Sequence, residues 1–272
     1  MARYARLLDK PTDAAGFEMQ ATQVNEAFQK RFFKPLDGVY DNGTQTSSIL
    51  PLYFQMVPDQ WRAGVLASLT RKIEQESHGH VGTGLVGAQW LMRTLSDNGH
   101  ADTAYEIATQ KTYPGWGYMV EKGATTIWEL WNGDTADPAM NSGNHVMQIG
   151  DLAVWMYEYL GGIRSDPEKP GFQHIVIHPY PAGDLTFVKA SHQSMYGAIR
   201  SAWKREGGKF TLDVTVPPNT TATVWLPAKD AAAVTEAGRP VKDARGVKFL
   251  RAEGGAALFE VESGSYTFGA AM

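Results

Sequence analysis

Apolar residues in the first 160 positions recur at the three- and four-residue spacings of amphipathic helices. Each stripe predicts one helix face, and we expect five or six helices before Gly161. Pro58 favours a helix start, and Gly161–Gly162 favours a stop. The stripes are Phe17, Ala21, Val24, Phe28 and Phe32; Trp61, Val65, Leu66, Leu69 and Ile73; Leu85, Ala88, Met92 and Leu95; Ala101, Ala104, Tyr105 and Ala108; and Val146, Ile149, Ala153, Met156 and Leu160.

Two long connecting segments separate these stripes, at 32–48 and 112–143. Both contain many Gly, Pro, Asn and aromatic residues. Long loops between helices carry functional residues more often than short ones do. We therefore expect the chemistry of this chain in these segments.

The pattern changes from a helical to a strand period after Gly161. Residues 164–171 indicate a linker, and 209–216 alternate as in a half-buried strand. Gly207–Gly208 favours a hairpin. Further strands are expected at 174–178, 196–205, 222–226, 246–251, 256–261 and 265–268. The fold class is therefore α+β, with a helical domain at 1–163 and an antiparallel β-sandwich at 164–272.

Composition narrows the function classes. The 272 residues carry a net charge of -4, so no basic excess favours nucleic acid. The absence of cysteine excludes disulfides and thiolate metal sites, and no uncharged stretch approaches the length of a membrane span. The N-terminus lacks the apolar run of a signal peptide, which predicts a cytoplasmic location. We find no phosphate-binding loop or metalloprotease motif and expect no cofactor or metal.

Residues 123–134 carry the most informative chemistry. Glu129 lies between Trp128 and Trp131, and Trp116 precedes them in another aromatic segment. Indole faces bind the apolar faces of sugar rings, and a carboxylate beside them suits general acid–base chemistry. The three tryptophans are expected to wall a carbohydrate pocket around Glu129. One carboxylate is half of the pair that glycoside hydrolysis uses.

Other polar residues leave alternatives open. His145 begins a predicted helix and is either a ligand-binding or a packing residue. His78 and His80 form a His-x-His pair, but no third ligand follows at a regular spacing, so zinc is the weaker interpretation. Residues 42–46 form either a hairpin-like loop or part of a sugar-binding rim.

Several segments together resemble the C-terminal portion of bacterial α-L-rhamnosidases of glycoside hydrolase family 78. The resemblance covers nearly the whole chain, and the Gly-Ala-Thr-Thr-Ile-Trp-Glu segment is its most specific part. The segments are 31–33, 42–46, 82–84, 113–118, 123–131, 140–141, His145, 162–164 and 216–222.

This resemblance implies an inverting hydrolase that releases terminal α-L-rhamnose. Its catalytic domain is an (α/α)₆ toroid followed by a β-sandwich. Glu129 matches the general base, and His145 matches a histidine that contacts rhamnose, although 142–144 lie between it and the Met-Asn pair. Trp116 and Trp128 match aromatic walls of the sugar subsite.

The sequence departs from the family in one respect. The general acid of the family lies in an Asp-Glu-Arg-Leu-Gly-Trp-like segment that this sequence lacks. Asp134 and Glu121 are the alternative acids, and nothing in the sequence favours either. The predicted helices make about half a toroid, which suggests a truncated product, a fragment or half of a split protein. Uncovered apolar helix faces then predict self-association.

Two other hypotheses belong to different classes. The missing acid is consistent with a non-catalytic carbohydrate-binding protein or remnant. A lyase or another toroid glycosidase would share the helical pattern, but not the segment at 127–131.

Overall fold

The structure is a computed structural model that describes residues 1–272, apart from the side chains at 146, 149 and 150. It contains two compact units that interleave along the chain. The domain boundary expected at 163–164 stays a prediction, and the second unit also includes residues that precede this boundary. The units are Met1–Thr94 with Ile107–Gln148, and Leu95–Glu106 with Ile149–Met272.

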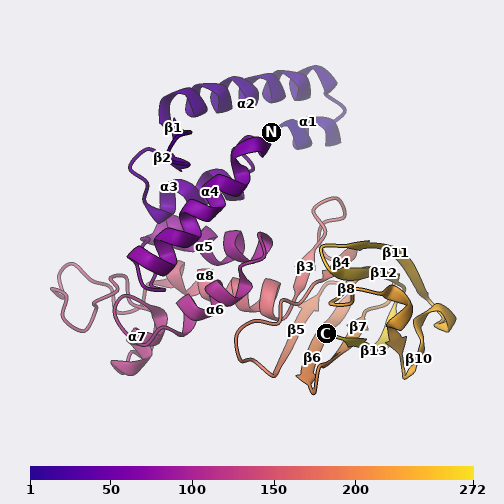
Figure 1. The fold of residues 1–272 in the computed structure, drawn as a ribbon. Coiled ribbons are helices and arrows are strands. Elements are labelled where there is room, and N and C mark those ends of the chain that lie inside the picture. Colours follow the sequence, from indigo (N-terminus) through magenta and orange to yellow (C-terminus); the bar gives the residue numbers. More distant parts are fainter. The chain divides into compact units, whose positions relative to one another are not determined.

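Helices form the regular structure of the first 160 residues almost entirely (Figure 1). The expected five or six is an underestimate, because α1 and α7 have six residues each and α3 contains Pro51, which argues against a helix in the sequence. The helices are α1 (Ala2–Leu7), α2 (Pro11–Phe32), α3 (Gln45–Tyr53), α4 (Asp59–Arg71) with the π-helical turn η1 (Lys72–Glu76), α5 (Leu85–Asp97), α6 (Ala101–Thr109), α7 (Trp116–Glu121), and α8 (Val146–Trp155) with the π-helical turn η2 (Met156–Leu160).

Most of the predicted stripes coincide with buried helix faces. Val65, Leu69 and Ile73 are buried on α4 and η1, and Ala88 and Met92 are buried on α5. In the last stripe, Val146 and Ile149 lie outside the described side chains. The helical periodicity of the sequence therefore predicted these buried helix faces correctly.

Helix α2 is the exception, since Ala21 and Val24 of its stripe are exposed. Its C-terminal end packs on β2, where the Phe28 ring lies 5.5 Å from that of Tyr40, and its N-terminal part packs on α1, with Ala14 buried. Figure 1 shows α1 folded back along α2. The predicted self-association stays a prediction. Among the described residues, no helix has the length and apolar character needed to cross a bilayer.

The connecting segments contain more regular structure than expected. In 32–48, strands β1 (Phe33–Lys34) and β2 (Val39–Tyr40) form a small hairpin that precedes α3. Helix α7 lies inside the long segment 112–143. This helix has only six residues in an aromatic and Gly-rich sequence, so the apolar pattern did not predict it.

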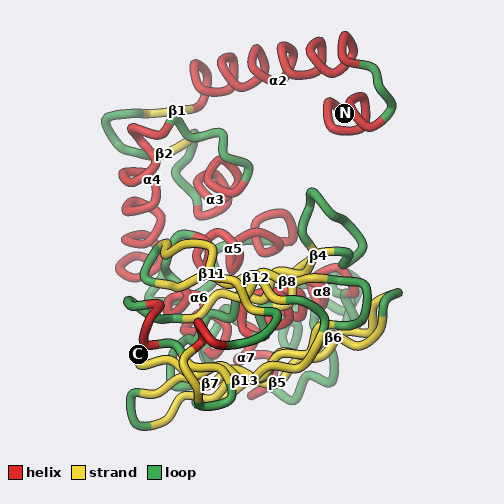
Figure 2. The backbone as a smooth tube through the Cα atoms, turned by 90° about the vertical axis from the view of Figure 1, so that its right-hand side faces the viewer, coloured by secondary structure: helices red, strands yellow, loops and turns green.

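The second unit contains a β-sandwich of two sheets, visible as two stacked layers of strands in Figure 2. One sheet has the order β10-β9-β13-β7-β6-β5 and the other β11-β12-β8-β4-β3. The strands are β3 (Ile163–Ser165), β4 (His174–Ile177), β5 (Phe187–Ser194), β6 (Gly197–Glu206), β7 (Lys209–Val216), β8 (Thr221–Leu226), β9 (Thr235–Glu236), β10 (Arg239–Pro240), β11 (Val247–Glu253), β12 (Ala256–Val261) and β13 (Gly264–Ala271).

The predicted sandwich is confirmed, with two corrections. Strand β4 pairs with β8 in parallel, so the sheets are not wholly antiparallel. Strand β3 occupies the start of the expected linker and pairs with β4. The hairpin at Gly207–Gly208 is confirmed, and both glycines have positive φ, as a tight β-turn between twisted strands requires.

Candidate functional site

The Glu129 segment is one arm of a loop whose two arms lie side by side. Residues 126–130 are hydrogen-bonded to residues 141–145, with no helix or strand in either arm. Thr126 Oγ1 also donates to the Gly143 carbonyl. The main contacts are the His145 N–H to the Ile127 carbonyl (2.8 Å), the Glu129 N–H to the Ser142 carbonyl (2.9 Å) and the Leu130 N–H to Asn141 Oδ1 (3.0 Å).

Glu129 is exposed, and its side chain is oriented by the opposite arm. The Ser142 N–H donates to Glu129 Oε2 at 3.2 Å. Gln148 Nε2 donates to the Glu129 carbonyl oxygen at 3.2 Å. The backbone of Glu129 is therefore held from two sides, while most of its carboxylate faces solvent.

The three tryptophans occupy different depths. Trp131 is half-buried, and its indole N–H donates to the Thr83 carbonyl at 2.8 Å. Trp116 is 2% exposed, and its ring meets that of Trp131 edge-on, with centroids 5.0 Å apart. Trp116 therefore supports Trp131 from within. Trp128 is half-buried and packs on Gly133, where an added Cβ would lie 2.6 Å from its ring.

Several buried polar atoms around this loop have no hydrogen-bond partner among the described residues. They are Thr83 Oγ1, Trp116 Nε1, His145 Nδ1 and Gln148 Oε1. Each belongs to a residue that contacts the segment 127–131 through its backbone, amide or ring. Unpaired buried polar atoms are rare in folded proteins. Their concentration here indicates a place where water or a bound molecule supplies partners.

The carboxyls considered as substitute acids are engaged elsewhere. Tyr118 Oη donates to Asp134 at 2.9 Å, and Lys122 Nζ lies 3.8 Å from the same carboxylate. Glu121 pairs with Lys111 at 2.9 Å. Neither contact connects these groups to Glu129.

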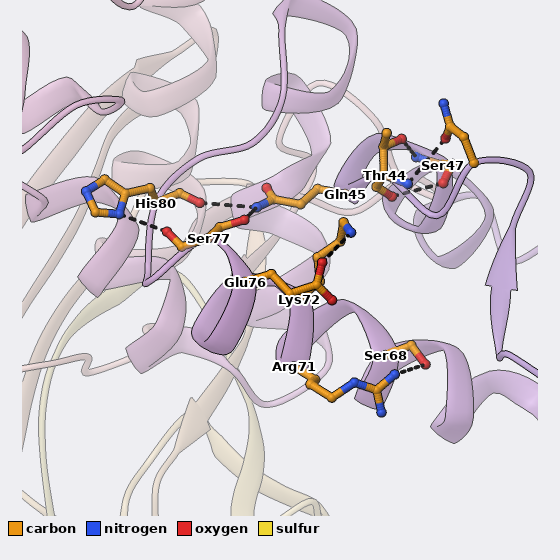
Figure 3. Close-up of polar contacts among 10 residues, drawn as sticks. Thr44, Gln45, Ser47, Ser68, Arg71, Lys72, Glu76, Ser77 and His80 are labelled. Carbon is orange, nitrogen blue, oxygen red and sulfur yellow. Dashed lines mark hydrogen bonds and ion pairs between the residues drawn. The ribbon is translucent and has the colours of Figure 1, made fainter.

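Residues 42–44 form the loop that connects β2 to α3, with Asn42 in a turn, and the helix begins at Gln45. The sugar-binding rim stays a prediction. Thr44 caps α3 by accepting the Ser47 N–H, a good start for a helix. Gln45 follows and is 2% exposed, with its amide bonded to the loop at 77–82 (Figure 3). Sequence reasoning treated Gln45 only as part of the segment 42–46, although its position beside a helix-capping threonine was a usable signal.

The His-x-His pair is divided between different environments. His80 uses both ring nitrogens, one with the Ser77 carbonyl at 2.9 Å and one with Thr112 Oγ1 at 2.7 Å. His78 has positive φ and belongs to the turn before it. In the part of the chain described, no three His, Asp or Glu side chains are grouped to hold a metal ion.

Two family models match the chain in sequence. Residues 1–160 match the bacterial α-L-rhamnosidase six-hairpin glycosidase domain. Residues 162–239 match the bacterial α-L-rhamnosidase C-terminal domain. Together they account for both the helical part and most of the sandwich.

Individual relatives agree with these models. An α-L-rhamnosidase of Streptomyces avermitilis is 38% identical over 98% of this chain and 25% of its own length. The crystal structure of the α-L-rhamnosidase of that organism complexed with L-rhamnose has a TM-score of 0.89 at 37% identity, over 98% of this chain and 25% of that one. The α-L-rhamnosidase structure from Dictyoglumus thermophilum also gives 0.89, at 32% identity over 100% of this chain and 30% of that one. The chain thus spans about a quarter to a third of the length of these relatives.

Proposed function

Because the chain belongs to the bacterial α-L-rhamnosidase family, we propose that it contributes the general base to the hydrolysis of terminal α-L-rhamnose from rhamnosides. Glu129 is that base in this proposal. An inverting glycosidase uses one carboxyl to protonate the leaving oxygen and another to activate water on the opposite face. The second role suits an exposed carboxylate.

The observation that carries this proposal is the setting of Glu129. Its backbone is fixed by Ser142 and Gln148, and its carboxylate remains open to solvent. Two half-buried tryptophans flank it, and unpaired buried polar atoms surround its loop. A rigid backbone with a free carboxylate can hold a water against a sugar ring. Trp128 and His145 are the residues we propose to contact that ring.

We propose that the general acid comes from outside this loop. Asp134 is bonded to Tyr118 and Glu121 to Lys111, so neither points to a leaving group beside Glu129. An inverting pair stands about 6.5–9.5 Å apart, across the sugar. This separation requires a carboxyl on the far side of the substrate from Glu129.

Hydrolysis of an aryl α-L-rhamnoside tests the role of Glu129. We expect Glu129→Gln to lower kcat by about 10²–10⁴-fold, the usual effect of removing a general base. Glu26→Gln removes an exposed glutamate of the same unit and serves as the matched control with unchanged kcat. Nuclear magnetic resonance of the first-formed product should show inverted anomeric configuration. Equal rates for wild type and Glu129→Gln would refute the assignment.

Non-catalytic carbohydrate binding is the second candidate, and the engaged carboxyls around Glu129 favour it. Calorimetric titration with L-rhamnose separates the two functions. Binding of L-rhamnose without hydrolysis of the aryl α-L-rhamnoside supports the second candidate. Binding of L-rhamnose together with hydrolysis of the aryl rhamnoside supports the first.

A further inference from the structure

Gln45 occupies an unusual position for a side chain that lies far from Glu129 in sequence. It is the first residue of α3, it is 2% exposed, and its amide makes every contact toward one loop, residues 77–82. A buried amide on a short helix stabilises a fold only if its donors and acceptor are matched. Here they are matched by the loop alone.

The contacts use both ends of the amide, as Figure 3 shows in part. Gln45 Nε2 donates to Ser77 Oγ and to the His80 carbonyl, each at 3.1 Å. Gln45 Oε1 accepts the Gly82 N–H at 2.9 Å. Three hydrogen bonds from one planar group fix the loop in position and in orientation.

The fixed loop leads directly to the candidate site. Gly82 is followed by Thr83, and the Thr83 carbonyl accepts the indole N–H of Trp131 at 2.8 Å. Trp131 directly follows the arm 126–130 and lies two residues from Glu129. The position of the Thr83 carbonyl therefore helps to set where this arm lies.

The helix α3 and this loop approach each other closely at two glycines. A Cβ added at Gly82 would lie 2.7 Å from Gln45 Nε2. A Cβ at Gly87 would lie 2.3 Å from Thr46 Oγ1 and 2.8 Å from the Thr83 side chain. Because these contacts are close, a displaced Gln45 amide is expected to displace the loop as well.

We propose that Gln45 is a positioning residue that holds Trp131, and through it the Glu129 arm, by fixing the Thr83 carbonyl. The effect on catalysis rests on the proposed function of Glu129, whereas the effect on Trp131 does not. The His80 ring also ties the middle of the loop to Thr112 Oγ1, at 2.7 Å. Gln45 is the tie next to Thr83.

Two variants perturb this contact by different means. Gln45→Leu keeps the approximate volume and removes all three hydrogen bonds. Gly82→Ala leaves Gln45 in the chain but pushes its amide away, and Gly82 has no positive φ that alanine would strain. Gln29→Leu is the matched control, because Gln29 also makes three hydrogen bonds, to Asn25, Met56 and Tyr40, but none to this loop.

The first measurement is the indole ¹H–¹⁵N resonance of Trp131, assigned with Trp131→Phe. We expect it to move in Gln45→Leu and Gly82→Ala and to stay in place in Gln29→Leu. Gln45→Glu retains the acceptor for the Gly82 N–H and should restore the resonance in part. If Gln45→Leu does not fold, the Trp131 resonance in Gly82→Ala tests the proposal. An unmoved resonance in the folded variants overturns the proposal, as does an equal movement in Gln29→Leu.

The second measurement is kcat on an aryl α-L-rhamnoside. A small misplacement far from the reacting atoms can lower a rate by about 10²-fold, and we expect a fall of up to that size in Gln45→Leu. If the resonance moves and wild type shows no hydrolysis, the proposed function fails while the positioning role stands. If the resonance moves and kcat is unchanged in an active protein, Gln45 does not position the catalytic arm.

Discussion

A half-buried histidine in the second unit makes stability depend on pH. His178 directly follows β4, stacks on Trp225 with ring centroids 4.1 Å apart, and accepts a hydrogen bond from Arg164 Nη2 at 3.0 Å. Burial, and the positive charge of Arg164, lower the pKa of His178 from 6.5 to about 3. The folded protein therefore keeps this imidazole neutral, with Nδ1 as an acceptor.

The sign and size of the effect follow from this pKa. In the unfolded chain His178 binds a proton below about pH 6.5, whereas in the folded chain it does so only near pH 3. Unfolding therefore takes up a proton in this window, and stability falls as the pH falls. At about 1.4 kcal/mol per tenfold change in proton affinity, the loss between pH 7 and pH 5 is about 2 kcal/mol.

Urea unfolding at pH 7 and pH 5, followed by amide exchange of β4 and β8, measures this loss. His178→Asn is the test variant, because its Oδ1 can still accept from Arg164 but does not titrate. We expect the pH-dependent loss to shrink by about 2 kcal/mol in this variant. His192→Asn, which removes an exposed histidine, is the control. An equal loss in wild type and His178→Asn would show that His178 is not held neutral.

Two further substitutions test the site and the sandwich. Gly133→Ala places a Cβ 2.6 Å from the Trp128 ring, so we expect weaker binding of L-rhamnose in calorimetry. Gly143→Ala is the control, because its Cβ would meet nothing within 4 Å. Unchanged affinity in Gly133→Ala would exclude Trp128 from the sugar site. Trp203 is 2% exposed, and Trp203→Phe removes its indole donor to the Leu160 carbonyl (2.7 Å). We expect the free energy of unfolding of the second unit, measured in urea, to fall by about 2–4 kcal/mol. A fall below about 1 kcal/mol would contradict the importance of that bond.

Sequence periodicity located the sandwich well where strands bury one face. Residues 209–216 became β7 without adjustment, because alternate side chains enter the core. The edge strand β5 (Phe187–Ser194) was missed, since Val188 and Ala190 are its apolar side chains packed against the core, and two positions are too few to show a period. The parallel pairing of β4 with β8 was also unpredictable, because it depends on which strands meet and not on the sequence of either.

The helical part shows a similar limit. The α2 stripe correctly predicted a helix, but Val24 within it is exposed, because periodicity reports a face without showing what covers it. At the site, the motif around Glu129 predicted aromatic neighbours, and the structure ties Trp131 to Trp116. The order of burial, with Trp116 innermost, required the fold.

The site can be tested cleanly because its framework and its chemistry use different atoms. The arms of the loop are joined mainly by backbone groups, such as the Glu129 N–H with the Ser142 carbonyl. The carboxylate of Glu129 accepts one hydrogen bond, at 3.2 Å, and is otherwise exposed. A glutamine in its place can still accept that bond through its amide oxygen, so the loop should keep its shape. Glu129→Gln therefore removes a base without removing a support, and a lost rate in a variant with an unchanged Trp131 indole resonance would be a loss of chemistry alone.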